Sequence, residues 1–574
     1  TDTYNTAVGY EAGVAVTTGK KNTIIGGLAG HALTTGLTNV VVGAQALSLD
    51  TLGSLSTAIG YSALENQNFT TATDSHNTAV GFKAGHIVTT GVQNTLLGSL
   101  AGDALTDADF NVALGYAALS SDTLGSRSVA IGRNALEAQN FTTATASNNT
   151  AVGYEVGRNM TTGIDNVLYG SNAGYALTDA DDNVAIGRSA LATDTLGKKS
   201  VAIGNNTLNA QNFTTATDTY NTVVGYNAGN DITTGTSNTL IGGLAGDALT
   251  DADFNIAIGV NSLTSDTLGS RSVAIGMGTL QTQNFTTATD TYNTVVGYNA
   301  GQEITTGINN TIMGGLAGDA FTTGNRNTLI GRAAGTAITT SNSDNTFIGE
   351  ACGAAMTTGD ANTFIGRYNG EAGLDLRTSS NNIVLSDGDG TPKLIINSAG
   401  THTIQSSLVG AAMIINNNAS SGTTEGVVID TPNRAVDGTA GHFLKCDDSS
   451  ATRMVIDLNG SLRNDDNSYG AISDERLKQD IVDATSQWDD IKALKVRKYK
   501  KKKDVVAYGE DAQVELGVIA QELETSGMSG LVSIDRDEYK SVKYSILYMK
   551  AVKALQEAMT RIETLEAKVS ALEA

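Results

Sequence analysis

Asn5-Thr-Ala-Val-Gly-Tyr10 is the stretch that decides the fold, because it recurs with small changes until about residue 370. Its copies begin at Asn77, Asn149, Asn221 and Asn293, so the step in residue number is a constant 72. Self-similarity at a fixed period is typical of repeat architectures, in which one structural unit stacks on the next. The sequence therefore predicts an elongated repeat structure in place of several globular domains.

A shorter unit, Asn/Ser-x-x-apolar-Gly, restarts within each block at spacings of 17, 17, 17 and 21. The longest spacing comes from an insert, Gln67–Thr73 in the first block, and the unit occurs 21 times between Gly9 and Gly366. Alternating polar and apolar residues predict a short strand, and Gly permits the positive-φ turn that follows. We therefore expect stacked β coils, about 4.8 Å apart over roughly 100 Å, with the first Asn of each unit forming a ladder.

The interior of such a coil is expected to be small. The residue before each Gly is aliphatic or Met in 20 units, as at Ile25, and is Tyr169 in the remaining one. A small residue, usually Ala as at Ala29, follows three positions after the Gly. One aliphatic residue and one Ala per coil make a thin core, so we expect three chains to wrap around a common axis and bury these faces together.

The repeat unit resembles two kinds of known fibre. Over residues 5 to about 370, Asn/Ser-x-x-Val/Ile-Gly is similar to the head repeats of trimeric autotransporter adhesins and to the shafts of some phage fibres. This resemblance implies a trimeric, left-handed β-roll.

Composition and charge exclude several classes of protein. The 574 residues carry a net charge of −23, and residues 1–472 hold −21 of it, which argues against a nucleic-acid partner. No apolar run reaches the roughly 18 residues of a membrane span. Cys352 and Cys446 are far apart and no Cys/His cluster occurs, so we predict no disulfide framework, metal or cofactor. The chain starts inside a repeat, so we expect an upstream part that joins other tail proteins.

Acidic turns are the only candidate metal sites that the sequence offers. Three blocks carry Asp-Ala-Asp, and such a spacing of oxygen ligands occurs at the start of calcium loops. The Gly and the distal Glu of a calcium loop are missing, so we favour solvated turns. The candidate residues are Asp107, Asp109, Asp179, Asp181, Asp251 and Asp253.

The repeat ends near Glu371, and residues 371–472 read as a second region. Short apolar runs separated by Gly, Asn, Asp and Ser predict a compact β connector or tip. The expected strands are Ile383–Leu385, Leu394–Ile396, Met413–Ile415, Val427–Ile429 and Met454–Ile456.

Composition changes again at Ser473, where charge rises and Gly falls. Ser473-Asp-Glu-Arg-Leu-Lys-Gln-Asp-Ile481 resembles the opening signature of the endosialidase-type intramolecular chaperones, a self-cleaving peptidase family at the ends of phage tail spikes and fibres. Gly517–Leu523 and Tyr539–Ser545 agree with later blocks of that family, in the same order. The resemblance implies a trimeric helical chaperone over residues 473–574 that assembles the preceding β-fibre.

The same resemblance implies self-cleavage at the Ile472–Ser473 bond, with Ser473 as nucleophile and Lys478 as general base. A serine hydroxyl needs a nearby base, and a lysine serves when its surroundings favour the neutral amine. Five residues is a poor same-face spacing on a helix, so we expect Ser473 to lie just before a helix, where it would also cap that helix. The alternative is that Ser473 is only a cap and that the domain merely trimerises.

The last segment predicts a coiled coil from about residue 544. Its apolar residues alternate at spacings of 3 and 4, which is the a/d seam of a coiled coil. A terminal trimeriser would also fix the register of three near-identical repeats, which otherwise slip easily. The seam residues are Leu555, Ala558, Ile562, Leu565, Val569 and Leu572.

These features together predict a mostly β protein. Residues 1–370 form a homotrimeric β-solenoid shaft of 17-residue coils, residues 371–472 a small β region, and residues 473–574 an α-helical chaperone that ends in a trimeric coiled coil. The expected function is a phage tail fibre, located in the virion, that binds a host-surface glycan or outer-surface protein. A glycan-degrading tailspike enzyme and a bacterial trimeric surface adhesin are the alternatives, and the latter is disfavoured because autotransporters end in a membrane anchor.

Overall fold

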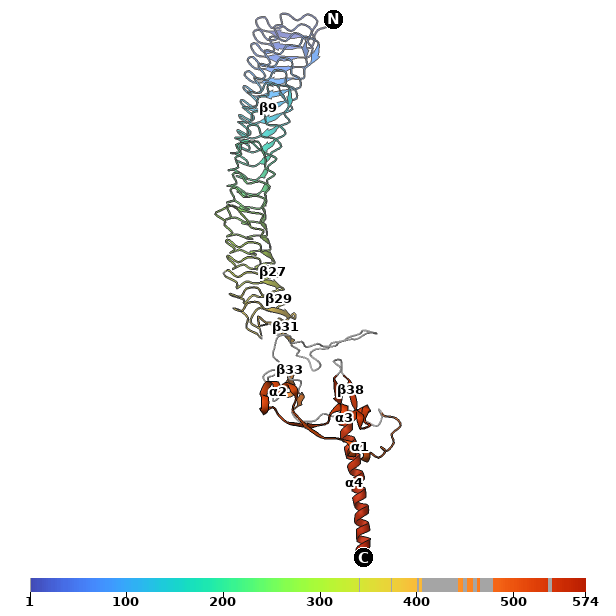
Figure 1. Cartoon of the computed structure of the whole chain (residues 1–574). Coiled ribbons are helices and arrows are strands. Elements are labelled where there is room, and N and C mark those ends of the chain that lie inside the picture. Colours follow the sequence, from blue (N-terminus) through green and yellow to red (C-terminus); the bar gives the residue numbers. More distant parts are fainter. Residues whose placement is uncertain are drawn as a thin grey trace. The chain divides into compact units, whose positions relative to one another are not determined.

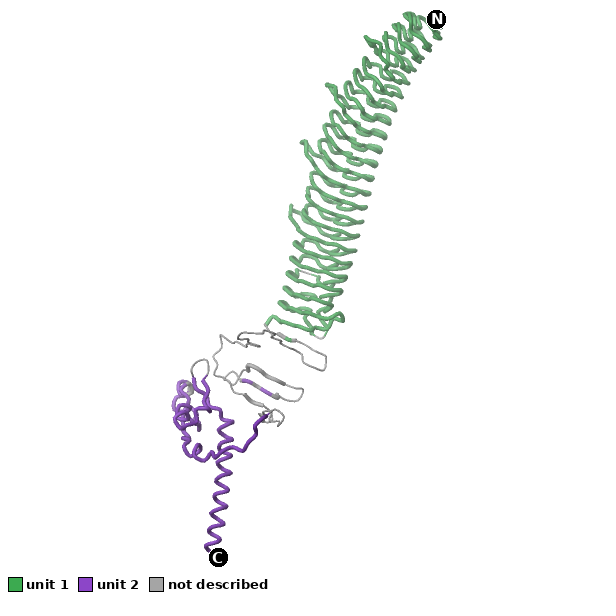
Figure 2. Tube along the Cα trace, turned by 90° about the vertical axis from the view of Figure 1, so that its right-hand side faces the viewer, with its two compact units in different colours: residues 1–418 green, residues 419–574 purple. Residues whose placement is uncertain are grey.

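A computed structural model gives the fold of two compact units, residues 1–418 and 419–574. It describes residues 2–339, 341–372, 374–399, 402–404, 442–447, 452–457, 462–464, 478–534 and 539–574. The first unit is a long stack of similar coils, blue to yellow in Figure 1 and green in Figure 2. This is the expected β-solenoid of short repeats, whose successive ladder residues, such as Asn22 and Asn39, are 17 apart in the sequence.

The coils are held together by one parallel ladder. Each short strand pairs in register with the equivalent strand of the next coil, as Thr239–Ile241 does with Ile256–Ile258. Asn382 and the strand after it extend the ladder past residue 370, where the repeat in the sequence ends. In the described residues the ladder holds 22 strands: β1 (Thr6–Val8), β2 (Thr23–Ile25), β3 (Val40–Val42), β5 (Thr57–Ile59), β7 (Thr78–Val80), β8 (Thr95–Leu97), β9 (Val112–Leu114), β11 (Val129–Ile131), β13 (Thr150–Val152), β14 (Val167–Tyr169), β15 (Val184–Ile186), β17 (Val201–Ile203), β19 (Thr222–Val224), β20 (Thr239–Ile241), β21 (Ile256–Ile258), β23 (Val273–Ile275), β25 (Thr294–Val296), β26 (Thr311–Met313), β27 (Thr328–Ile330), β28 (Thr346–Ile348), β29 (Thr363–Ile365) and β30 (Ile383–Ser386).

Further strands belong to the inserts and to the region after the shaft. Two-residue parallel pairs mark the inserts: β4 (Gly53–Ser54) with β6 (Thr73–Asp74), β10 (Gly125–Ser126) with β12 (Thr145–Ala146), β16 (Gly197–Lys198) with β18 (Thr217–Asp218), and β22 (Gly269–Ser270) with β24 (Thr289–Asp290). Antiparallel strands follow: β31 (Pro392–Ile396) and β32 (His402–Ile404), then β33 (His442–Asp447), β34 (Thr452–Asp457) and β35 (Leu462–Asn464). Three of the expected strands of this region are found within β30, β31 and β34, whereas Met413–Ile415 and Val427–Ile429 lie outside the described residues.

Each coil encloses its own apolar core, which corrects one expectation. In the coil that starts at β2, the buried residues are Ile24 in the middle of the strand, Ala29 and Leu33. Ile25, the residue before the Gly, is 39% exposed and faces outward. The expectation that the residue before the Gly is buried was wrong, because strand residues alternate between faces and the middle one points inward. Since a single chain closes each coil, three chains need not wrap around one another to build the core.

The predicted Asn ladder and the predicted turn at Gly are both confirmed. The backbone N–H of Asn39 donates to Oδ1 of Asn22 at 2.9 Å, and Nδ2 of Asn39 donates to the carbonyl oxygen of Gly53 at 3.0 Å. Gly132 has a φ of +135°, and a Cβ atom there would lie 2.0 Å from the carbonyl oxygen of Gly153. The Gly is therefore required both by the turn and by the close approach of the next coil.

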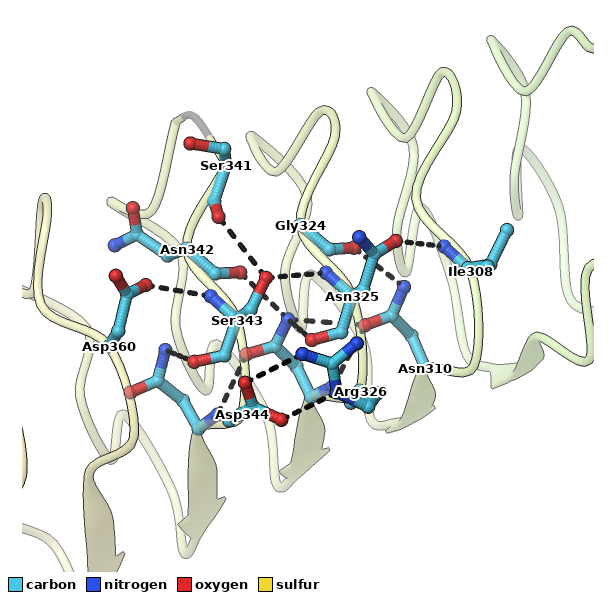
Figure 3. A network of polar contacts seen from close by, with 12 residues as sticks. Ile308, Asn310, Gly324, Asn325, Arg326, Ser341, Asn342, Ser343, Asp344 and Asp360 are labelled. Atoms are coloured by element: carbon cyan, nitrogen blue, oxygen red, sulfur yellow. Dashed lines mark hydrogen bonds and ion pairs between the residues drawn. The ribbon is translucent and has the colours of Figure 1, made fainter.

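A second side-chain ladder runs beside the first, two residues earlier in each coil, as Figure 3 shows near the end of the shaft. Oδ1 of Asn325 accepts from the backbone N–H of Ile308 at 2.8 Å, and the N–H of Asn325 donates to Oγ of Ser343 at 3.1 Å. The N–H of Ser343 in turn donates to Oδ1 of Asp360 at 2.8 Å. Polar residues at this position therefore connect successive coils.

A buried carboxylate, not expected from the sequence, organises each insert. Oδ1 of Asp50 accepts from the N–H of Gly53 at 3.0 Å, and Oδ2 accepts from Nε2 of Gln67 at 2.7 Å. Gln67 also donates to Ser56 at 2.9 Å and accepts from Nδ2 of Asn77 at 2.8 Å. Burial raises the pKa of Asp50, although its hydrogen bonds lower it. This network replaces the Asn ladder where Ser stands in for Asn, and the Asp–Gln pair recurs at Asp122–Gln139, Asp194–Gln211 and Asp266–Gln283.

The C-terminal part of the second unit is a small α+β assembly. Its core consists of Leu523, Met528, Leu531 and Leu547. The elements are α1 (Trp488–Ala493), β36 (Arg497–Tyr499), α2 (Lys502–Tyr508), η2 (Gly509–Asp511), β37 (Glu515–Gly517), α3 (Ala520–Thr525), η3 (Ser529–Leu531), β38 (Val532–Ile534), β39 (Lys540–Val542) and α4 (Tyr544–Glu573). β36 pairs antiparallel with β37, and β38 with β39. None of the helices in the described ranges has the length and apolarity needed to cross a membrane.

Candidate functional site

The two residues expected to carry out cleavage are not brought together in the described structure. Ser473 lies outside the described residues, as does Ile472. Lys478 begins the described segment and is exposed. Residues 478–487 are not helical, and the first helix begins at Trp488, so the helix expected close behind Ser473 is absent from this described stretch. The roles of Ser473 and Lys478 stay predictions.

The segment that follows Lys478 is anchored to the last helix, α4. The carboxylate of Glu557 accepts from Oγ of Ser486 at 2.6 Å and from the N–H of Gln487 at 3.0 Å. The bond from Ser486 is the largest cause that lowers the pKa of Glu557, so the carboxylate stays ionised where it holds this segment. These contacts place the chain just after Lys478 along one side of α4.

Helix α1 adds a second anchor on α4. Nζ of Lys550 donates to Oδ2 of Asp490 at 2.7 Å. The guanidinium of Arg561 lies 4.2 Å from the centre of the Trp488 ring, which is a favourable cation–π distance. Residues 486–490, which follow the candidate cleavage residues in the sequence, are therefore tied to the same helix that carries the predicted coiled-coil seam.

Among the residues that the structure describes, nothing covers most of the apolar seam of α4. Ile562 is 53% exposed and Leu565 is 60% exposed, although both are large apolar residues. All six seam residues are exposed or half-buried. The expected helix is confirmed and begins at Tyr544, whereas the coiled coil itself needs other chains and stays a prediction.

Residues 497–503 are basic apart from Tyr499, span β36 and the start of α2, and include two side chains that contact acids. Arg497 donates to both carboxylate oxygens of Glu522, at 2.9 and 2.6 Å, and this contact lowers the pKa of Glu522. Lys501 lies 2.8 Å from Glu515, on the paired strand. The run is thus matched by acids of its own domain.

The acidic turns serve to connect coils. Oδ1 of Asp109 accepts from the N–H of Val92 at 2.7 Å, and Oδ1 of Asp107 accepts from the hydroxyl of Thr90 at 2.6 Å. Asp179, Asp181, Asp251 and Asp253 make equivalent bonds to the preceding coil. Among the described residues, no group of three or more His, Cys, Asp or Glu side chains could hold a metal ion.

Comparison with known proteins bears on the C-terminal segment. The family described as "Chaperone of endosialidase" matches residues 473–532, so the match starts at Ser473 and runs to the beginning of β38. No curated protein and no solved structure matches the chain. The chain therefore carries a chaperone-of-endosialidase domain at its C-terminal end, behind a β-solenoid shaft.

Proposed function

We propose that this protein is a homotrimeric tail fibre or tailspike of a bacteriophage, located in the virion, whose shaft is assembled by the C-terminal chaperone domain. The observation that carries the proposal is the match of residues 473–532 to the chaperone-of-endosialidase family on the same chain as a β-solenoid of 22 strands. A chaperone of this kind is needed where three chains must be aligned during assembly. The exposed apolar seam of α4 offers the surface for that contact.

The repeat itself explains why an assembly domain is needed. Coils at β7, β13, β19 and β25 have nearly the same sequence, so two shafts displaced by one whole block would present almost the same surfaces. Register is weakly specified when neighbouring units are equivalent. A terminal domain that trimerises first aligns the three chains before the shafts pack together.

The proposed cleavage is an attack of Oγ of Ser473 on the carbonyl carbon of Ile472. The C–N bond breaks as the acyl group moves from the nitrogen of Ser473 to its hydroxyl oxygen, and Lys478 takes up the hydroxyl proton and passes it to the leaving nitrogen. Water then hydrolyses the ester, which leaves a carboxylate on Ile472 and a free amine on Ser473. Because Lys478 is exposed in the single chain, the burial that favours a neutral amine has to come from another chain. Cleavage is thereby linked to trimer assembly.

Intact mass of the freshly expressed chain tests this function. Wild type is expected to yield two fragments that end at Ile472 and begin at Ser473, while Ser473→Ala stays at 59.1 kDa. Ser570→Ala, at an exposed position near the C-terminal end of α4, is the matched control and should cleave like wild type. If wild type stays whole under conditions where it is trimeric, the self-cleavage mechanism is wrong and the domain is a permanent cap.

Receptor binding is the remaining part of the proposal. Exposed aromatic rings recur beside the first turn Gly of every block, at Tyr10, Phe82, Tyr154, Tyr226 and Tyr298, and such rings can stack on sugars. Binding of the labelled fibre to bacterial cells, with and without removal of the surface polysaccharide, tests whether the receptor is a glycan or an outer-surface protein.

A further inference from the structure

The large parallel sheet of the shaft has an outward face that carries apolar side chains along its whole length. The outward strip is defined here as the first and third residues of the 22 strands from β1 to β30. The third residue is apolar in every one of these strands, from Val8 to Leu385, and none of these residues is buried. Several are strongly exposed, for example Leu97 at 44% and Tyr169 at 59%. Figure 1 shows the strands stacked along one side of the solenoid.

The outward strip also carries no charge. The first residue of each of these 22 strands is Thr, Val or Ile, and neither it nor the third residue is ever Asp, Glu, Lys or Arg. The chain as a whole has a net charge of −23. The acids therefore lie elsewhere on the coils, as at the exposed Asp231 and Asp251.

The exposed area of the outward strip is larger than the exposed apolar patches usual on monomeric proteins. Two half-exposed side chains per strand expose on the order of 100 Å², so 22 strands expose about 2,000 Å² per chain, whereas a stable interface needs about 800 Å² from each partner. Contiguous apolar patches on monomers rarely exceed a few hundred Å². The strip is therefore large enough to hold a stable partner.

We propose that the outward strip is the surface through which three copies of this chain pack, side by side and in register, about an axis parallel to the shaft. This inference rests on the proposed homotrimer and names the surface that forms it. A second copy is the occupant because it presents the same residues at the same rise per coil, about 4.8 Å, along the whole length.

Charge supports the same occupant. Two copies that approached through their acidic turns would bring like charges together, which costs energy. Approach through the outward strip brings only Thr, Val, Ile and other uncharged side chains into contact and keeps the acidic turns in solvent. In the proposed trimer, three closed solenoids therefore pack through their outward strips, and the chains are not interwoven.

Cysteine substitutions on the full chain test the strip. In a background of Cys352→Ala and Cys446→Ala, the variants Thr239→Cys and Ile241→Cys place a thiol on β20 within the strip. Asp231→Cys, exposed about half a coil away from β19, is the matched control. Each is analysed by native mass spectrometry, by alkylation of the thiol in the native state, and by mild oxidation followed by a non-reducing gel.

The expected result is a trimer in which at least one strip thiol resists alkylation and forms disulfide-linked dimers, while Asp231→Cys is alkylated and stays unlinked. A trimer whose strip thiols are alkylated as fast as the control overturns the inference and leaves the proposed trimer standing. A trimer with protected strip thiols whose native mass includes another molecule also overturns it, because that molecule then covers the strip. A monomer overturns the proposed function together with the strip.

Discussion

Removal of a single ladder amide is expected to open the shaft locally. Asn238 is fully buried, and its Oδ1 accepts from the N–H of Asn255 at 3.0 Å while its Nδ2 donates to the carbonyl oxygen of Ala252 at 2.8 Å. Asn238→Ala leaves both of these backbone groups buried without a partner. Each such group costs about 1–3 kcal/mol, so the local opening free energy should fall by at least about 2 kcal/mol.

Hydrogen exchange measured by mass spectrometry reads this effect directly, because repeat proteins open coil by coil and global unfolding is not two-state. Peptides that cover residues 239–256 should exchange at least roughly 30-fold faster in Asn238→Ala, since about 1.4 kcal/mol corresponds to a factor of ten. Asn230→Ala is the control, because Nδ2 of Asn230 makes only an exposed bond to Asp231. Equal exchange in the two variants would refute the view that the Asn ladder stabilises the stack.

Three other changes test separate features. Gly132→Ala forces a Cβ atom to within 2.0 Å of the carbonyl oxygen of Gly153 at a φ of +135°, so thermal unfolding should begin at least several degrees lower, and an unchanged melting curve would contradict this. Burial raises the pKa of Asp50, so its contribution to stability is present below the ordinary Asp pKa of 3.8 and is lost as the pH rises through the raised value. The stability of wild type relative to Asp50→Asn should therefore fall as the pH rises above about 4, as followed by hydrogen exchange of the first insert; a pH-independent difference would refute this. Ile562→Asp places a charge in the α4 seam and should lower the fraction of freshly expressed chain that assembles into the trimer, as measured by size-exclusion chromatography with light scattering, whereas Glu563→Ala should not.

The repeat made most of the shaft predictable. Asn, the strand and Gly recur together, and each has a separate physical reason to do so, namely a ladder, an extended segment and a positive-φ turn. All three predictions are confirmed at the coil that starts at Asn22. The C-terminal helix was likewise predictable, because the apolar spacing of 3 and 4 between Leu555 and Leu572 has no β interpretation.

The direction of side chains was less predictable. Ile24 and Ile25 are equally apolar, and the sequence does not say which of them points into the coil. The inward residue is the middle one because such a small closed coil has room for it beside the Ala and the Leu of the same coil. Asp50 was overlooked for a similar reason, since a lone carboxylate in an acidic chain resembles a surface residue until Gln67 is seen to reach it.

The sequence by itself determined the period, the stacking of β coils, the Asn ladder and the assembly domain that begins at Ser473, because each depends on residues that recur or match locally. Only the tertiary structure decided which residues are enclosed and which are left facing outward. Leu28, for example, adopts a φ of +61° that a leucine avoids on its own, and its N–H bonds to the carbonyl oxygen of Tyr10 in the preceding coil at 2.8 Å. Contacts between coils outweigh such local preferences, and they leave an uncharged strip along the shaft that no single repeat reveals.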